Sequence, residues 1–243
     1  MSTHYKRVPL FGGALVVDLP EKFADVRYVL LSAPSVLEQR SSHGTCAQRT
    51  LAGRRSTDGP KSGFANPARV RSKLRQVPDN QEVYIDKDGF TSIIFDLTER
   101  VGPRESTSLE ADGQALTTHL EELVGDDADS VKVWNTTETQ FTHLDLDIPA
   151  YTLIATQTPQ STSRERATVP DFTALILTLV RLEREGTDIL ITINVPHIKG
   201  EYDEEEVDLS LGKQGELIGN AVEYAAKIWE TFEVKDWGLF KEI

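Results

Sequence analysis

Apolar positions near the C-terminus recur at spacings of three and four, which predicts a helix over residues 213–232 with one continuous core-facing stripe. The stripe consists of Leu217, Ile218, Ala221, Val222, Ala225, Ile228, Trp229 and Phe232. Residues 108–124 predict a second amphipathic helix, with Ser108 as its N-cap and Gly125 just after its end. The apolar positions of this second helix are Leu109, Leu116, Leu120, Leu123 and Val124.

Other segments predict strands, and two of them are long and rich in β-branched residues. Residues 173–184 and 187–195, joined by Glu185 and Gly186, form the strongest hairpin pattern in the chain. Further strands are expected within 9–19, after Gly12 and Gly13, and at 81–85, 91–97, 131–134, 140–146 and 151–157. Because many strands follow one another without a helix between them, we expect a largely antiparallel sheet covered by helices, an α+β domain.

The charge balance narrows the partner classes. The chain has 243 residues, with 26 basic and 39 acidic side chains and a net charge of −13. Such a chain repels phosphate backbones, so we expect no nucleic-acid partner and favour a basic protein surface. We expect no membrane partner, because no apolar run approaches the roughly 18 residues that a membrane helix needs. A single cysteine, Cys46, excludes an intramolecular disulfide.

Residues 27–71 differ from the rest of the chain. They carry eight basic and two acidic residues, are rich in Ser, Gly, Pro and Arg, and lack sustained periodicity. This composition predicts a disordered basic insert within one domain that spans residues 1–243. We consider two origins: a translated intron or gene-model error, and a genuine basic loop.

The sequence contains no established catalytic, cofactor or metal motif. Residues 53–62 imitate a phosphate-binding loop, but Pro60 removes a main-chain donor and the spacing is one residue too long. The five histidines are scattered, and no GxSxG elbow is present. We therefore expect no catalytic residue, no cofactor and no metal ion, and we expect a monomer.

Two acidic segments stand out. Residues 201–208 carry six carboxylates in eight positions, which indicates either a solvated loop or a patch that steers a basic partner. The second segment, 77–83, has the sequence VPDNQEV, in which Asp79 and Glu82 are three positions apart. In one helical or 3₁₀ turn both carboxylates would face the same way. Paired carboxylates can serve acid/base catalysis. The plainer interpretation is a turn whose aspartate caps its own backbone.

Several stretches together resemble one known family. They are LFGGA at 10–14, PEKFADV at 20–26, LRQVPDNQEVY at 74–84, SIIFDL at 92–97, LVRLEREGTDILITINVP at 179–196 and WGLF at 237–240. In this order they resemble the Mog family of Ran-binding nuclear import factors, also called Ran guanine nucleotide release factors. The resemblance covers nearly the whole chain except the insert.

The resemblance implies an α/β/α sandwich, with a central, mostly antiparallel sheet flanked by helices, shared with PsbP-like proteins. It implies a non-enzymatic regulator, in nucleus and cytoplasm, that binds the GTPase Ran, promotes release of its guanine nucleotide and supports nuclear protein import. The VPDxQE motif of the family carries over onto Asp79, Asn80, Gln81 and Glu82 as the expected Ran-binding residues. Alanine at Asp79 or Glu82 is expected to preserve the fold and weaken Ran binding by roughly 1–3 kcal/mol.

Two alternatives remain open. The chain could be a small ligand-binding enzyme or hydrolase that uses Asp79 and Glu82, for which a deep pocket holding both carboxylates would speak. It could also be a PsbP-like extrinsic subunit that shares the fold. The family pattern usually runs from the PEKFADV segment directly into the segment that begins at Ser72. If the intervening insert is real, its basic charge could mask Asp79 and Glu82.

Overall fold

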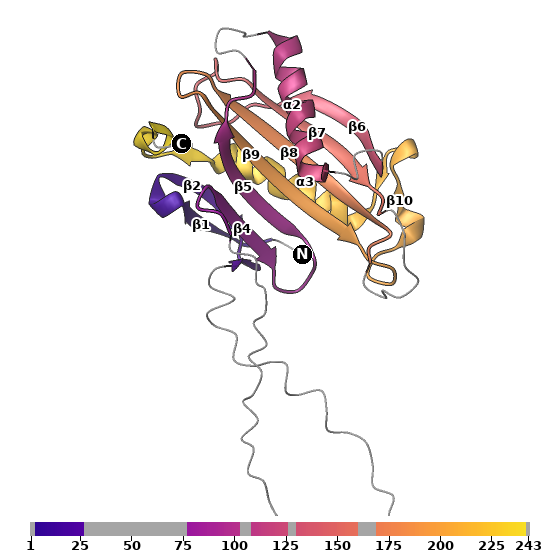
Figure 1. The fold of residues 1–243 in the computed structure, drawn as a ribbon. Helices are drawn as coiled ribbons and strands as arrows, with labels where there is room; N and C mark the ends of the chain where they lie inside the picture. The colour runs from indigo at the N-terminus through magenta and orange to yellow at the C-terminus, as the bar shows by residue number, and fades with distance from the viewer. Residues whose placement is uncertain (1–2, 27–76, 103–107, 126–129, 160–168, 242–243) are drawn as a thin grey trace, which may run out of the picture.

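The computed structural model describes residues 3–26, 77–102, 108–125, 130–159 and 169–241 (Figure 1). The expected disordered insert at 27–71 lies outside these residues. The strands are β1 Tyr5–Leu10, β2 Leu15–Pro20, β3 Phe23–Asp25, β4 Gln81–Asp86, β5 Ser92–Glu99, β6 Val131–Glu138, β7 Ala150–Gln157, β8 Phe172–Leu182, β9 Thr187–His197, β10 Val207–Asp208, β11 Lys213–Gln214 and β12 Glu233–Val234. The helices are α2 Leu109–Val124 and α3 Gly215–Thr231, with short 3₁₀ turns η1 Phe11–Gly13, η4 Glu204–Glu206, η5 Leu209–Leu211 and η6 Trp237–Lys241.

A seven-stranded sheet forms the centre of the molecule, in the order β3-β4-β5-β9-β8-β7-β6. Each neighbouring pair in this sheet is antiparallel. The hairpin β8–β9 is its longest pair and closes at Leu182 opposite Thr187, so the turn contains Glu185 and Gly186 as predicted. A large antiparallel sheet with two helices confirms the expected α+β class at this level.

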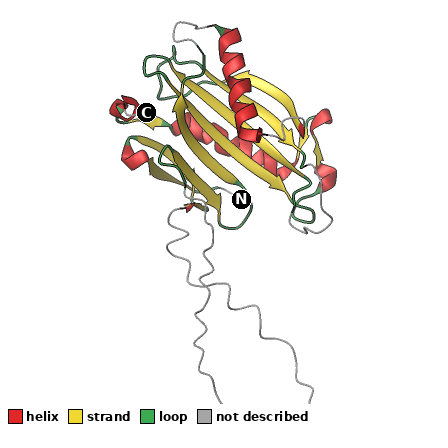
Figure 2. Ribbon diagram, viewed as in Figure 1, coloured by secondary structure: helices red, strands yellow, loops and turns green. Residues whose placement is uncertain are grey.

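The two helices pack against opposite faces of this sheet, as Figure 2 shows. Side chains alternate along a strand, so consecutive residues of β8 reach different helices. Leu175 and Leu177 share a buried cluster with Leu116 of α2. Ile176 belongs instead to the larger cluster that contains Ile218 of α3. The apolar β8 sequence is therefore explained by burial on both faces.

A second sheet joins the two ends of the chain. Strand β2 pairs with β1 on one side and with β12 on the other, and Val16 lies opposite Glu233. Leu15, Val17 and Leu19 of β2 are fully buried and belong to the same core cluster as α3. Helix α3 is therefore packed between the main sheet and this small one. No local pattern in the sequence predicts the pairing of β2 with β12.

Helix α2 begins and ends where its capping residues predict. The Ser108 hydroxyl accepts a hydrogen bond from the Ala111 N–H at 3.2 Å, and Gly125 adopts a φ of 59° at the other end. Its buried face differs from the expected one, however. Leu109 and Leu123 are exposed, whereas Asp112 and His119 are buried. The buried face predicted from the apolar spacing was wrong at these positions because polar side chains of α2 face an ion-pair cluster in the sheet.

One further expectation needs correction. Residues 140–146, predicted as a strand, form turns and irregular chain; Phe141 and Leu144 point inward while Leu146 is 83% exposed. A turn, and not a strand, buries these two apolar side chains, which are three positions apart. Helix α3 matches its stripe and also buries Tyr224. No helix in the described ranges is long and apolar enough to cross a bilayer.

Candidate functional site

The predicted VPDxQE site lies where a turn leads into strand β4. The Gln81 N–H donates to the Pro78 carbonyl at 3.0 Å, which closes the turn, and β4 starts at Gln81. Asp79 lies at the tip of this turn and is exposed. The expectation of a turn at Pro78 and Asn80 is therefore confirmed, and its closure comes from a main-chain hydrogen bond.

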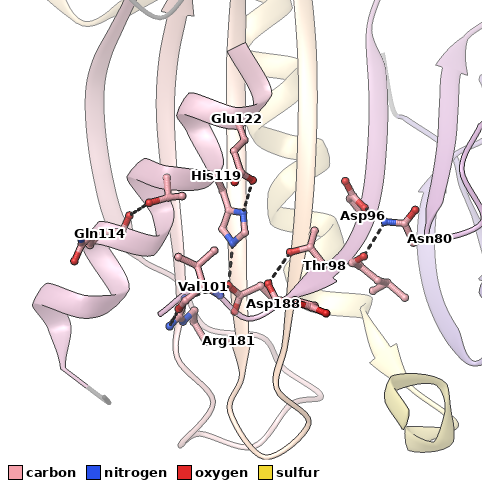
Figure 3. A network of polar contacts seen from close by, with 12 residues as sticks. Asn80, Asp96, Thr98, Val101, Gln114, His119, Glu122, Arg181 and Asp188 are labelled. Atoms are coloured by element: carbon pink, nitrogen blue, oxygen red, sulfur yellow. Dashed lines mark hydrogen bonds and ion pairs between the residues drawn. The ribbon is translucent and has the colours of Figure 1, made fainter. Parts of the chain in front are cut away.

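The two amides of the motif hold a carboxylate of the neighbouring strand β5. The Asn80 amide donates to Asp96 Oδ1 at 2.9 Å and to the Leu97 carbonyl at 2.9 Å, as shown for Asn80 and Asp96 in Figure 3. The Gln81 amide donates to Asp96 Oδ2 at 2.7 Å. Partial burial raises the pKa of Asp96, and the hydrogen bond from Gln81 opposes this rise. Asn80 and Gln81 thus fix the turn on the sheet.

Glu82 occupies a different environment from Asp79. Residues 82, 84 and 86 of β4 are its buried positions, and the side chain of Glu82 is buried with 3% of the residue exposed. Its Oε1 accepts a hydrogen bond from the main-chain N–H of Phe11 at 2.7 Å, and its Oε2 accepts one from the Tyr84 hydroxyl at 3.1 Å. The contact with Phe11 spans 71 positions of sequence and connects β4 with the loop between β1 and β2.

The structure corrects the hypothesis of paired carboxylates. The chain enters β4 at Gln81, so Asp79 and Glu82 do not share one helical turn. Asp79 faces solvent, while Glu82 points under the loop at Phe11. Cavities of about 410, 320, 140 and 80 Å³ occur in the described part of the chain, and neither residue lines any of these four. None of these four cavities is therefore the deep pocket, holding both carboxylates, that an acid/base enzyme requires.

A buried ion cluster between α2 and the main sheet is the largest polar feature that the sequence reasoning missed. Asp188 of β9 is fully buried, and its Oδ2 lies 2.9 Å from His119 Nε2 and 3.1 Å from an Arg181 amino group (Figure 3). The main-chain N–H of Val101 donates to the same oxygen at 3.0 Å. Arg181 also pairs with Asp112 of α2, with 3.2 Å between Nε and Oδ1.

This cluster connects helix α2 with the main sheet. Arg181 additionally donates to the Val101 carbonyl at 3.0 Å, and Tyr151 donates its hydroxyl to Asp112 at 3.1 Å. Burial and the neighbouring Asp112 raise the pKa of Tyr151 to about 12. One sequence signal could have revealed the cluster: Arg181 and Asp188 are opposite charges within two apolar strands and pair directly across the β8–β9 hairpin.

The acidic segment 201–208 is exposed along most of its length. Asp203 caps the short turn η4 by accepting the Glu205 N–H at 3.0 Å. Tyr202 donates its hydroxyl to Asp171 at 3.1 Å, and burial together with this contact raises its pKa to about 12. The role of the segment as a steering patch stays a prediction.

Comparisons with known proteins place this geometry in a family. The family model described as Ran-interacting Mog1 protein matches residues 66–196, more than half of the chain and the part that contains the turn and β4–β9. A Dictyostelium discoideum protein named probable Ran guanine nucleotide release factor is 24% identical over 200 residues, 80% of this chain and 75% of that relative.

Solved structures show the same fold. The Saccharomyces cerevisiae Ran-binding protein Mog1p superposes with a TM-score of 0.58 at 21% identity, over 98% of this chain and all of that chain. A point mutant of Mog1 gives a TM-score of 0.57 at 21% identity, over 98% and 99% of the two chains. Because the family model matches more than half of the chain, the chain belongs to the family of Ran-interacting Mog1 proteins.

Proposed function

We propose that this protein binds the GTPase Ran and promotes the release of its guanine nucleotide. It thereby supports nuclear protein import, and it is located in both the nucleus and the cytoplasm. The observation that carries this proposal is the VPDxQE motif at 77–82, presented on the family fold with its aspartate exposed. We include Asp79, Asn80, Gln81 and Glu82 in the Ran-binding site. We further propose one domain with the α/β/α sandwich of the family and a role without covalent catalysis.

The turn is suited to contact a partner because it is rigid beneath and charged at its tip. Asn80 and Gln81 are tied to Asp96, so the Asp79 carboxylate is presented without a large loss of loop entropy on binding. An exposed carboxylate on a fixed turn can pair with a basic side chain of Ran. The net charge of −13 adds long-range attraction to a basic surface.

Nucleotide release follows from differential affinity. A GTPase holds its nucleotide through a P-loop, Mg²⁺ and ordered switch loops. A partner that binds the nucleotide-free form more tightly than the loaded form shifts the equilibrium towards release. Tenfold faster release requires about 1.4 kcal/mol of extra stabilisation at the transition state for release. A few contacts from one turn are sufficient for this amount.

The test is stopped-flow release of a fluorescent guanine nucleotide from Ran at increasing concentrations of this protein. We expect acceleration by the wild-type protein and, for Asp79→Ala, an apparent affinity about tenfold lower with an unchanged melting temperature. Asp88→Ala is the matched control, because Asp88 is an exposed aspartate in the turn at the opposite end of the β4–β5 hairpin. Equal effects of the two variants, or no acceleration by the wild-type protein, would contradict the proposal.

A further inference from the structure

The loop that Glu82 holds is an unusual piece of backbone. Phe11 has a φ of 48° although it is not a glycine, and Gly12 and Gly13 follow with φ values of 68° and 96°. A bulky residue with positive φ costs of order 1–3 kcal/mol and persists where its surroundings enforce it. The hydrogen bond from the Phe11 N–H to Glu82 Oε1, at 2.7 Å, helps to hold Phe11 in this conformation.

The far end of the same loop is also anchored. The Ala14 carbonyl accepts the N–H groups of Lys235 at 2.8 Å and of Asp236 at 3.1 Å. Gly12 is exposed, and Phe11 packs partly against the core. A β-carbon added at Gly12 or Gly13 would meet no atom within 4 Å, so the glycines leave open space above the loop. Such backbone allows another main chain to approach closely.

Asp79 lies near the residue that holds the loop. Three residues of extended chain span about 10 Å, so Asp79 lies within that reach of Glu82, which touches Phe11 directly. Figure 1 shows the β1–β2 hairpin beside β4. A partner protein that pairs with Asp79 can therefore reach the loop Phe11–Gly13 as well.

We propose that Glu82 is a positioning residue, which does not itself contact Ran but holds the loop Phe11–Gly13 in the shape that, together with Asp79, contacts Ran. This inference rests on the proposed function and assigns different tasks to the two carboxylates of the motif. Burial supports the assignment, because a side chain in a residue that is 3% exposed has little surface to offer a partner. The carboxylate acts through the main chain that it holds.

A pair of substitutions separates positioning from charge. Glutamine at position 82 loses the negative charge, yet its amide oxygen can accept the Phe11 N–H and its amide nitrogen can donate to the Tyr84 hydroxyl. Alanine removes the hydrogen bonds with the Phe11 N–H and the Tyr84 hydroxyl. In the nucleotide-release assay we expect Glu82→Gln to stay within about threefold of the wild-type affinity, and Glu82→Ala to lose at least about tenfold. If Glu82→Gln loses as much as Glu82→Ala, Ran recognises the charge itself and the inference is overturned.

Asp86 provides the matched control for loss of stability. It lies on the same buried face of β4 and pairs with Lys22 at 2.7 Å, away from the loop. We expect Asp86→Ala to lower the melting temperature and to leave Ran affinity unchanged at temperatures where the protein is folded. Amide exchange measured by NMR gives a readout of the loop: the Phe11 amide should lose protection in Glu82→Ala and keep it in Glu82→Gln.

A second variant tests the loop without touching Glu82. Gly13→Val places a β-branched residue at a φ of 96°, which forces the loop into another conformation. Gly212→Val is its control, because Gly212 has a φ of 75°, has no atom within 4 Å of an added β-carbon and lies at the end of η5. We expect Gly13→Val to lose at least about tenfold in affinity and Gly212→Val to lose little.

The outcomes distinguish the inference from the function on which it rests. Full affinity of folded Gly13→Val overturns the inference, because the loop is then no contact. A wild-type protein that neither binds Ran nor accelerates release overturns the proposed function itself. Loss of affinity in Gly13→Val and Glu82→Ala, with affinity retained in Glu82→Gln, supports both.

Discussion

Two buried carboxylates of this protein, Asp188 and Glu82, have partners of different kinds. Asp188 is contacted by side chains of α2 and β8, His119 and Arg181, and by the Val101 N–H, so it connects a helix with the main sheet. Glu82 accepts hydrogen bonds from the Phe11 N–H and the Tyr84 hydroxyl, and thus connects a strand with an exposed loop. The first carboxylate stabilises packing, whereas the second determines the shape of a surface.

The difference shows that burial by itself does not separate structural from functional acids. What separates them is the element on the other side of the hydrogen bond. When that element is a regular helix or strand, loss of the carboxylate reduces the free energy of unfolding. When it is a strained loop at the surface, loss of the carboxylate also changes the surface that a partner meets.

The largest expected effect on stability is that of Asp188→Ala. It leaves the buried Arg181 and His119 without their shared carboxylate, and breaking a buried charge pair from one side costs about 3–5 kcal/mol. We expect urea titration to show this loss in the free energy of unfolding. The folded fraction of the variant should accelerate nucleotide release from Ran as the wild-type protein does. Glu205→Ala, at an exposed position of η4, should change stability little. A loss below about 1 kcal/mol for Asp188→Ala would contradict the structural role of the cluster.

Much of the fold follows from local sequence patterns. The β8–β9 hairpin, the apolar stripe of α3 and the two caps of α2 appear in the sequence because each depends on residues close together in the chain. The pairing of β2 with β12 depends instead on segments at opposite ends of the chain. The mistaken strand at 140–146 has the same origin, since the burial of Phe141 and Leu144 is decided by distant packing partners.

The candidate site divides in the same way. The turn at Pro78 and Asn80 could be predicted, because turn propensity is local. The burial of Glu82 could not, because its partner Phe11 lies 71 positions away in sequence. Nothing in the local sequence around Gly12 and Gly13 indicates that a glutamate of β4 lies under this loop. Motif residues that are adjacent in sequence therefore alternate between solvent and interior as soon as a strand begins.

A smaller effect is expected from removing one hydroxyl in each region. Tyr84→Phe removes a donor to Glu82, and Tyr151→Phe removes a donor to Asp112 of the Arg181 cluster. Loss of one such hydrogen bond costs about 0.5–1.5 kcal/mol. We expect both variants to lose stability in this range by urea titration and to keep wild-type Ran affinity, because the bond between Phe11 and Glu82 remains. A loss of affinity in Tyr84→Phe as large as that in Glu82→Ala would show that the phenol, too, holds the loop.

The smallest effect concerns the pH dependence of stability at Asp96, which holds Asn80 and Gln81. Burial raises the pKa of Asp96 in the folded state above its ordinary value of 3.8, so the folded protein binds this proton more tightly than the unfolded chain does. Ionisation of Asp96 therefore opposes folding at neutral pH, and the opposition disappears as the pH falls through the raised pKa towards 3.8.

Asp96→Asn removes this titration and exposes its sign. As the pH falls from neutral towards 4, the wild-type free energy of unfolding should increase relative to that of Asp96→Asn, although both decrease as other carboxylates become protonated. Only the pH dependence of the difference in free energy of unfolding between the two proteins reports the titration of Asp96. The pH-independent part of this difference also contains the altered hydrogen bonds to Asn80 and Gln81. If the wild-type free energy of unfolding instead decreases relative to that of Asp96→Asn on acidification, hydrogen bonds from the two amides outweigh burial. The turn is then held most firmly when Asp96 is charged.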